Sequence, residues 1–181
     1  MRPRAPIVKD IVLLGGGHSH IAVLKSFGMH PIPGVRLTLI NRDVDTPYSG
    51  MLPGLIAGHY NVDQAHIDLN PLARFAGARF IRATALGIDA EAQIVQLEDR
   101  PDVRYDILSI NTGSTPATRG TPGAAANTVP VKPISRFLDH WNRLLARVAQ
   151  HDGPIRIGVV GGGPAGSPSD AMAPGRAQNA A

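Results

Sequence analysis

The chain of 181 residues has no cysteine, few aromatic side chains and no long hydrophobic run. Without cysteine there can be no disulfide bridge, no thiolate metal site and no redox-active dithiol. Aromatic residues make up only 4%, so a core has to be built from Ile, Leu, Val and Ala. No run reaches the roughly 20 apolar residues of a membrane-spanning helix. We therefore expect a soluble, cytoplasmic protein without a signal peptide or a transmembrane segment.

Charged residues are also sparse, at 18%, and they leave a net charge of +4. The arginines are scattered along the chain and form no basic run, so a nucleic-acid partner is not expected. The excess of positive charge indicates a mild preference for anionic ligands. Apolar residues make up 43%, and the length suffices for one ordinary domain with a sizeable core.

The stretch IVLLGGGHSHIAVL, residues 11–24, predicts a buried strand, a glycine turn and a helix. The helix should end near Gly28 and Pro31, and GVRLTLINRD, residues 34–43, should form the next strand. Such a βαβ unit has a right-handed crossover. The fold class predicted is α/β: a Rossmann-like, three-layer domain around a parallel sheet.

The remaining segments extend this pattern. We expect a Gly- and Pro-rich loop at residues 46–60, one helical stretch broken near Pro71 at 62–78, and two strands joined by a turn at 78–99. A buried strand should follow at 103–114, then a long loop at 115–132, a helix at 133–153 and a further parallel strand at 154–163. A small antiparallel β excursion is expected at residues 86–105.

The glycine turn has the chemistry of a dinucleotide site. A diphosphate needs backbone N–H groups at a helix N-terminus and no side chain in the way. Gly15 would make the tight turn, and Gly17 would let the diphosphate approach. The third position of the fingerprint is usually small, so that helix and strand pack closely, but His20 occupies it. A purely structural turn is the alternative.

The expected acidic residue at the end of the second strand is absent. Asn41 stands there, followed by Arg42 and Asp43. Asn41 can hydrogen-bond a ribose hydroxyl, with Asp43 as second candidate, or it can simply end the strand. His18 and His20 have no third ligand nearby, so hydrogen bonding to backbone or phosphate is favoured over metal binding.

Several segments occur in a fixed order that is similar to one family. They are LLGGGHSHIAVLKSFG, LTLINRDVDTPYSGMLPGLIAGHY, YDILSINTGSTP, VPVKPISRF and IGVVGGGPAG. Together they resemble the NADH-dehydrogenase-like flavoproteins of the pyridine nucleotide–disulfide oxidoreductase superfamily. GGGHSH and PYSGMLPG point within it to the subgroup associated with selenide, water dikinase. The resemblance implies FAD-dependent oxidation of NAD(P)H, with electrons passing to a small acceptor such as a quinone. It also implies a cytoplasmic protein that can be peripheral to the membrane, and it names no catalytic acid or base.

The resemblance implies a set of cofactor-binding positions. The FAD diphosphate, ribose, adenine and ring would meet Gly15, Gly16, Gly17, His18, Ser19, His20, Asn41, Arg42, Tyr48, Ala85, Thr112 and Gly113, with Met51 beside the flavin. The NAD(P)H diphosphate would meet Gly161, Gly163 and Gly166. For Gly113, Tyr48 and Met51 a structural role, as a turn or as core or lid residues, is the alternative.

The sequence departs from the family after Gly166, where Pro168 and Pro174 interrupt the helix that should follow. We expect an FAD-binding domain at residues 1–130, a linker helix with the first strand and glycine loop of an NAD(P)H domain at 131–166, and a disordered or frameshifted tail at 167–181. A truncated reading frame is favoured over a naturally short protein. A non-catalytic nucleotide-binding remnant is the alternative function, and an unfinished sheet would self-associate through its exposed face.

Overall fold

The computed structural model describes residues 6–116 and 120–160. The chain divides into two compact units, the first made of residues 1–46 and 66–113, and the second of 47–65 and 114–181. The first unit contains a parallel sheet in the order β5-β2-β1-β9. Its strands are β1 (Lys9–Leu14), β2 (Val35–Asn41), β5 (Arg79–Arg82) and β9 (Ile107–Ile110). The predicted α/β fold with a parallel sheet is confirmed.

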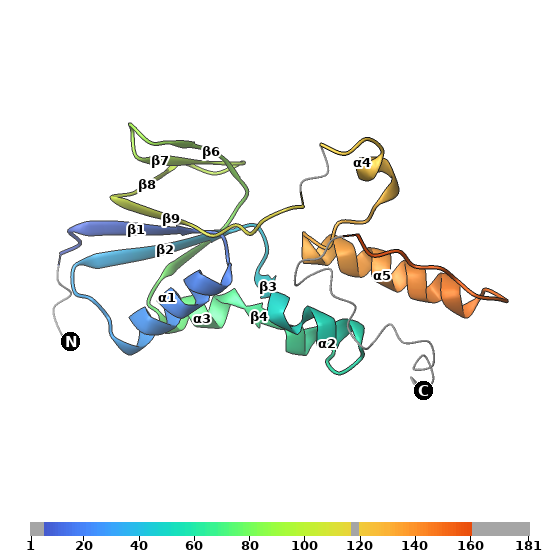
Figure 1. The fold of residues 1–181 in the computed structure, drawn as a ribbon. Coiled ribbons are helices and arrows are strands. Elements are labelled where there is room, and N and C mark those ends of the chain that lie inside the picture. The colour runs from blue at the N-terminus through green and yellow to red at the C-terminus, as the bar shows by residue number, and fades with distance from the viewer. Residues whose placement is uncertain (1–5, 117–119, 161–181) are drawn as a thin grey trace. The chain divides into compact units, whose positions relative to one another are not determined.

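Two helices and a second sheet cover the two faces of this parallel sheet (Figure 1). The helices α1 (His18–Met29) and α3 (Leu69–Phe75) share one face. The other face carries an antiparallel sheet of β6 (Ala85–Asp89), β7 (Ile94–Leu97) and β8 (Val103–Arg104). The first unit therefore has three layers, and the β excursion expected at residues 86–105 is confirmed.

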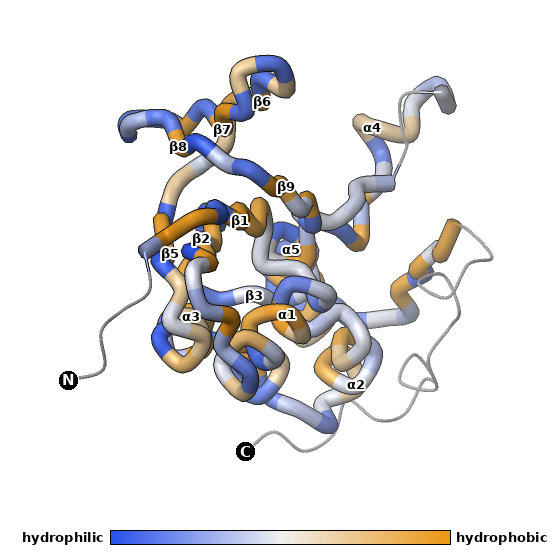
Figure 2. The backbone as a smooth tube through the Cα atoms, turned by 90° about the vertical axis from the view of Figure 1, so that its left-hand side faces the viewer, coloured by the Kyte–Doolittle hydropathy of each residue, from blue (hydrophilic) through white to orange (hydrophobic). Residues whose placement is uncertain are grey.

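The core follows from alternation along β1 and β2, because successive side chains of a strand point to opposite faces. Val12 and Leu14 pack with the antiparallel sheet, whereas Leu13 packs with α1 and α3. Ile40 and Leu39 divide between the two clusters in the same way. Hydrophobic segments accordingly gather in the central strands and in α1 (Figure 2). Burial on both faces explains why these strands are continuous apolar runs in the sequence.

The remaining described elements belong to the second unit or to the parts of the chain where one unit ends and the other begins. They are β3 (Asp45–Pro47), the 3-10 helix η1 (Ser49–Met51), α2 (Leu52–Ile56), the 3-10 helix η2 (Asp63–Ala65), β4 (His66–Asp68), α4 (Ala124–Asn127) and α5 (Ile134–Ala149). The strands β3 and β4 form a two-stranded sheet. The predicted long helix is confirmed as α5, on which Phe137 stacks on Trp141 with ring centroids 6.4 Å apart.

The prediction of one helical stretch at residues 62–78 is wrong about its extent. Only α3 is α-helical, preceded by η2 and β4. Asp68 caps α3 by accepting a hydrogen bond from the backbone N–H of Asn70 at 2.9 Å. Pro71 then lies in the first turn, where its missing N–H costs no helical hydrogen bond. The proline therefore marks a helix start and does not break a longer helix.

Three strand predictions also need correction. Residues 78–99 hold three strands, because β5 joins the parallel sheet before β6 and β7 form their hairpin. Residues 103–114 hold two short strands, β8 and β9, and β9 is an edge strand whose Ile107 and Ile110 are 51% and 57% exposed. Residues 154–160 form no strand, because no described strand lies alongside to pair with them, and Val160 is 90% exposed. The expected glycine run at 161–163 lies outside the described residues.

Candidate functional site

The connection between β1 and α1 consists of Gly15, Gly16 and Gly17 alone. Gly15 has φ +96°, a conformation that side chains disfavour. A Cβ on Gly15 would lie 2.3 Å from the backbone oxygen of Asn111 and 2.7 Å from Cα of Thr112. The turn therefore requires glycine at this position for two separate reasons, its backbone conformation and its contact with the end of β9.

Asn111 supports the other end of the turn. Its backbone N–H donates to the carbonyl of Leu14 at 2.8 Å, and its own carbonyl accepts from the N–H of Gly17 at 3.2 Å. A Cβ on Gly17 would lie 2.3 Å from Asn111 Oδ1. The side-chain amide also donates to the hydroxyl of Ser19. Sequence reasoning missed Asn111, although it chose the next two residues, and a polar residue directly after an apolar run was the available signal.

Asn41 holds the middle of the turn. Its Oδ1 accepts a hydrogen bond from the N–H of Gly16 at 2.9 Å, and its Nδ2 donates to the carbonyl of Asp43 at the same distance. Asn41 is the last residue of β2, beside β1 in the sheet. Its side chain thus ties the glycine turn to the carboxyl end of β2.

His20 faces the interior and is 1% exposed. Its Nδ1 lies 2.6 Å from the carbonyl oxygen of Gly15, and its Nε2 lies 2.9 Å from Oγ of Ser109 on β9. A carbonyl only accepts, so Nδ1 carries the proton, and the Ser109 hydroxyl donates to Nε2. Burial lowers the pKa of His20 below its usual 6.5, which favours this neutral ring. The predicted hydrogen bonding of a histidine to backbone is confirmed for His20.

His18 differs from His20 in being exposed at the first position of α1. The described residues contain no group of three or more His, Cys, Asp or Glu side chains arranged to hold a metal ion.

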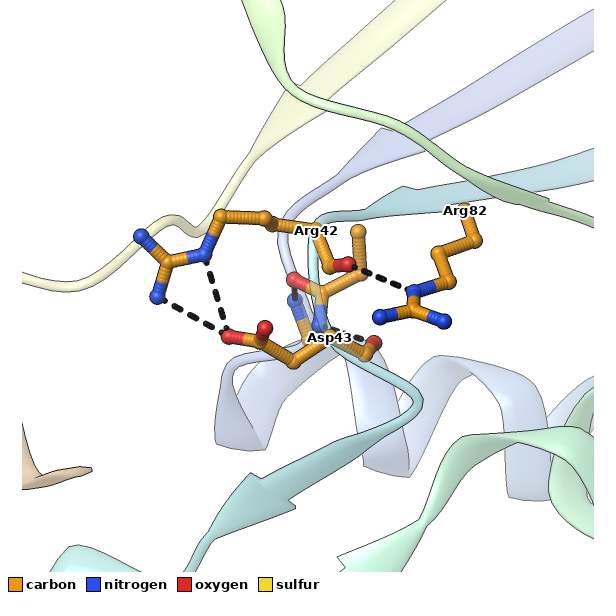
Figure 3. A network of polar contacts seen from close by, with 5 residues as sticks. Arg42, Asp43 and Arg82 are labelled. Carbon is orange, nitrogen blue, oxygen red and sulfur yellow. Dashed lines mark hydrogen bonds and ion pairs between the residues drawn. The ribbon is translucent and has the colours of Figure 1, made fainter.

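A charged pocket of about 370 Å³ lies at the carboxyl ends of β2 and β5, lined by Arg42, Arg82, Ala83, Thr84, Glu98, Asp99 and Arg100. Arg42 pairs with Asp43 at 2.9 Å, and this hydrogen-bonded partner raises the pKa of Arg42. Nε of Arg82 donates to the carbonyl of Arg42 at 3.3 Å (Figure 3). Ala85, the first residue of β6, follows the pocket-lining Thr84 directly. The pocket offers guanidinium donors and backbone groups. Like the glycine turn, it lies at the carboxyl ends of the parallel strands.

The structure brings together the glycine turn, His20 and Asn41, with Thr112 against Gly15. Gly113 ends this segment with φ +87° and open space around its Cβ position. Tyr48 belongs to the second unit, where it precedes η1 and is 41% exposed, and Met51 ends η1. Gly161, Gly163 and Gly166 lie outside the described residues.

Comparison with known proteins gives consistent results. Residues 9–168 match the family described as pyridine nucleotide-disulphide oxidoreductase. The sulfide-quinone reductase of Aquifex aeolicus is 29% identical over 159 residues, which are 86% of this chain and 36% of that relative. A crystal structure of the sulfide:quinone oxidoreductase of Aquifex aeolicus superposes with a TM-score of 0.64 at 26% identity, covering 78% of this chain and 33% of that one.

NDH2 from Plasmodium falciparum, solved in complex with NADH, shares the fold with a TM-score of 0.64 at 18% identity, over 78% of this chain and 30% of that one. The chain thus spans about a third of the length of the relatives it matches. Within the described ranges, no helix is both long and apolar enough to cross a membrane.

Proposed function

The chain belongs to the pyridine nucleotide-disulphide oxidoreductase family, and we propose that its first glycine turn binds the diphosphate of FAD. The observation that carries this proposal is the turn itself. Gly15–Gly17 connects a central parallel strand to the N-terminus of α1, with no side chain on the turn and none capping the helix. A helix N-terminus next to a glycine turn is a favourable place for a diphosphate.

The residues present fit such a group. Atoms of Asn111 already occupy the space that a Cβ would need at Gly15 and Gly17, so these two positions of the turn require glycine. The first turn of α1 contains no acidic residue that would repel an anion. The turn is held by Asn41, His20 and the end of β9, so its shape exists without a ligand. Such preorganisation lowers the entropy cost of binding.

We assign the other positions by their order along the bound dinucleotide. His18 and Ser19 would lie at the diphosphate, and Asn41 and Arg42 near the ribose. Ala85 would meet the adenine through its backbone. Thr112 and Gly113 would lie where the chain returns to the cofactor, with Tyr48 and Met51 along the ring. The charged pocket of Arg42 and Arg82 fits the adenosine end, because it lies at the ends of β2 and β5.

For the remainder of the chain we keep the organisation that the resemblance implies. Residues 1–130 would form the FAD domain and 131–166 the linker and start of an NAD(P)H domain, whose Gly161, Gly163 and Gly166 would receive that cofactor. The tail at 167–181 lies outside the described residues. Membership of the selenide, water dikinase-associated subgroup and a cytoplasmic location at or near the membrane belong to the same proposal.

The proposed activity is oxidation of NAD(P)H with transfer of electrons to a small acceptor. When bound, the flavin supplies the hydride-accepting chemistry, and the protein supplies position and electrostatics. A quinone is favoured as acceptor, because a relative is named sulfide-quinone reductase. This chain has no cysteine, so a dithiol has no part in its chemistry. We assign no general acid or base.

Flavin titration followed by reduction tests the proposal. The purified chain is titrated with FAD, and binding is followed by quenching of flavin fluorescence; NADH or NADPH is then added without oxygen. Bound flavin that bleaches supports the oxidoreductase. Bound flavin that stays oxidised supports nucleotide binding without turnover. A chain that binds no FAD contradicts the proposed site. The variant Arg36→Ala, which removes an exposed ion pair with Asp10 away from the turn, should bind like the parent and serves as control.

A further inference from the structure

We propose that His20 is a positioning residue that, together with Asn41, holds the Gly15–Gly16 peptide in one orientation. The effect on ligand affinity rests on the proposed FAD site, whereas the two hydrogen bonds to the peptide are present in the protein without a ligand. In the dinucleotide fingerprint this position is usually a small residue whose role is close packing of helix on strand. Here a buried aromatic ring with two hydrogen-bonding nitrogens occupies it.

The two side chains hold the same peptide unit from opposite ends. A trans peptide is planar, so the carbonyl of Gly15 and the N–H of Gly16 point in opposite directions. His20 Nδ1 donates to that carbonyl at 2.6 Å, and Asn41 Oδ1 accepts from that N–H at 2.9 Å. Glycine peptides rotate easily because no Cβ restricts them. Rotation of this unit would break both hydrogen bonds together.

Each side chain is itself fixed by a different strand. His20 Nε2 accepts from the hydroxyl of Ser109 on β9, at 2.9 Å. Asn41 ends β2, and its Nδ2 donates to the carbonyl of Asp43 at 2.9 Å. In the sheet, β2 and β9 are the two neighbours of β1. The peptide that follows β1 is therefore tied to the strands on both sides.

These hydrogen bonds also determine which backbone N–H groups of the turn remain available to a ligand. The N–H of Gly16 is committed to Asn41, so a diphosphate would be received by N–H groups at the start of α1, beyond the held peptide. Asn41 then acts mainly as a support of the turn, which explains why an amide, with both a donor and an acceptor, stands where a carboxylate is usual. A carboxylate at this position would accept from Gly16 but could not donate to Asp43.

The first experiment tests the two hydrogen bonds to the Gly15–Gly16 peptide in the absence of a ligand. In the full chain labelled with ¹⁵N, long-range proton–nitrogen spectra near neutral pH should show His20 with the proton on Nδ1, and exchange of the Gly16 amide with solvent should be slow. Exposed His30, at the end of α1, serves as internal reference. A proton on Nε2 of His20, or a rapidly exchanging Gly16 amide, would overturn the proposal.

The second experiment separates positioning from packing through paired variants. Asn carries a donor near the place of Nδ1, so His20→Asn keeps the hydrogen bond to Gly15, while Gln reaches the place of Nε2, so His20→Gln keeps the one to Ser109. Both leave a smaller side chain, so both should lower the thermal midpoint. We expect FAD affinity within about threefold of the parent for His20→Asn and weaker by about tenfold for His20→Gln, the effect of one lost hydrogen bond.

Equal losses of affinity in the two variants, or losses that simply follow the thermal midpoint, would reduce His20 to a packing residue and refute the positioning role. The control variant His30→Gln should change neither readout. If the parent chain binds no FAD, the proposed function fails, and the nitrogen spectra and the Gly16 exchange rate still decide whether the peptide is held.

Discussion

Replacing Gly15 with alanine tests the close approach between the glycine turn and β9. In the structure, two separate penalties fall on this substitution. The backbone has φ +96°, and the new Cβ would lie 2.3 Å from the backbone oxygen of Asn111 and 2.6 Å from its carbonyl carbon. Because those atoms are backbone, relief requires the end of β9 to move away from β1, which would break the hydrogen bond from Asn111 N–H to the carbonyl of Leu14.

The magnitude follows from adding the two penalties and comparing them with a matched site. Gly77 also has a positive φ, +62°, but a Cβ there meets nothing within 4 Å. Gly77→Ala should therefore cost only the left-handed backbone penalty of about 1–2 kcal/mol. Gly15→Ala should cost about 1–3 kcal/mol for its backbone conformation and a further 1–3 kcal/mol or so for overpacking. Both glycines belong to the first unit, so both changes act on the same fold.

Equilibrium urea denaturation followed by far-ultraviolet circular dichroism measures both losses. The backbone penalty applies to both glycines, so we expect Gly15→Ala to lose more free energy of unfolding than Gly77→Ala by the overpacking cost, about 1–3 kcal/mol. Equal losses would refute the reasoning, because they would mean that β9 does not press against the turn. A Gly15→Ala chain that is unfolded without urea, beside a folded Gly77→Ala chain, would agree with it.

Three further predictions concern residues of the first unit. Burial lowers the pKa of His20, so the stability that the neutral ring contributes is complete above the unfolded pKa of 6.5 and is lost as pH falls through the folded pKa. The free energy of unfolding should therefore fall less steeply with decreasing pH in His20→Asn than in the parent. Equal slopes in the two proteins would contradict this. Leu39→Ala, at a fully buried position, should cost about 2–5 kcal/mol in urea denaturation. Gly28→Ala should change the free energy of unfolding by less than about 1 kcal/mol. The gain in helix propensity offsets the displacement of the Phe75 ring, which is 55% exposed. A large loss would mean that the ring cannot move aside.

The fold was readable from the sequence where one physical factor dominated. The apolar runs of β1 and β2, and the glycines between β1 and α1, predict a parallel sheet with a turn at its edge. The period of apolar residues in α5 predicts that helix. Predictions failed where pairing or capping decided the outcome. Asp68 starts α3 next to Pro71, and residues 154–160 lack a neighbouring strand, and neither condition can be judged from local composition.

The candidate site was predicted as a set of positions but not as a set of contacts. The glycine turn, His20 and Asn41 were named, and the structure brings them together. Asn111 and Ser109 were missed, because their importance comes from β9 lying beside β1, almost 100 residues later in the sequence. Ser109 lies within the short strand β9 and Asn111 directly follows it, so a polar residue at the end of an apolar run was the signal that the sequence offered.

The irregular position of the fingerprint becomes intelligible through these distant contacts. A small residue at position 20 would let α1 approach the sheet, but it would leave the Gly15 carbonyl without the donor that His20 supplies. Buried polar groups have to be hydrogen-bonded, so the ring is acceptable only because Ser109 satisfies its second nitrogen. The histidine and the serine therefore depend on each other. Replacing His20 by glycine would restore the usual fingerprint, but it would leave a cavity next to the turn. It would also remove the hydrogen-bond partner of the Gly15 carbonyl and that of the half-buried Ser109 hydroxyl.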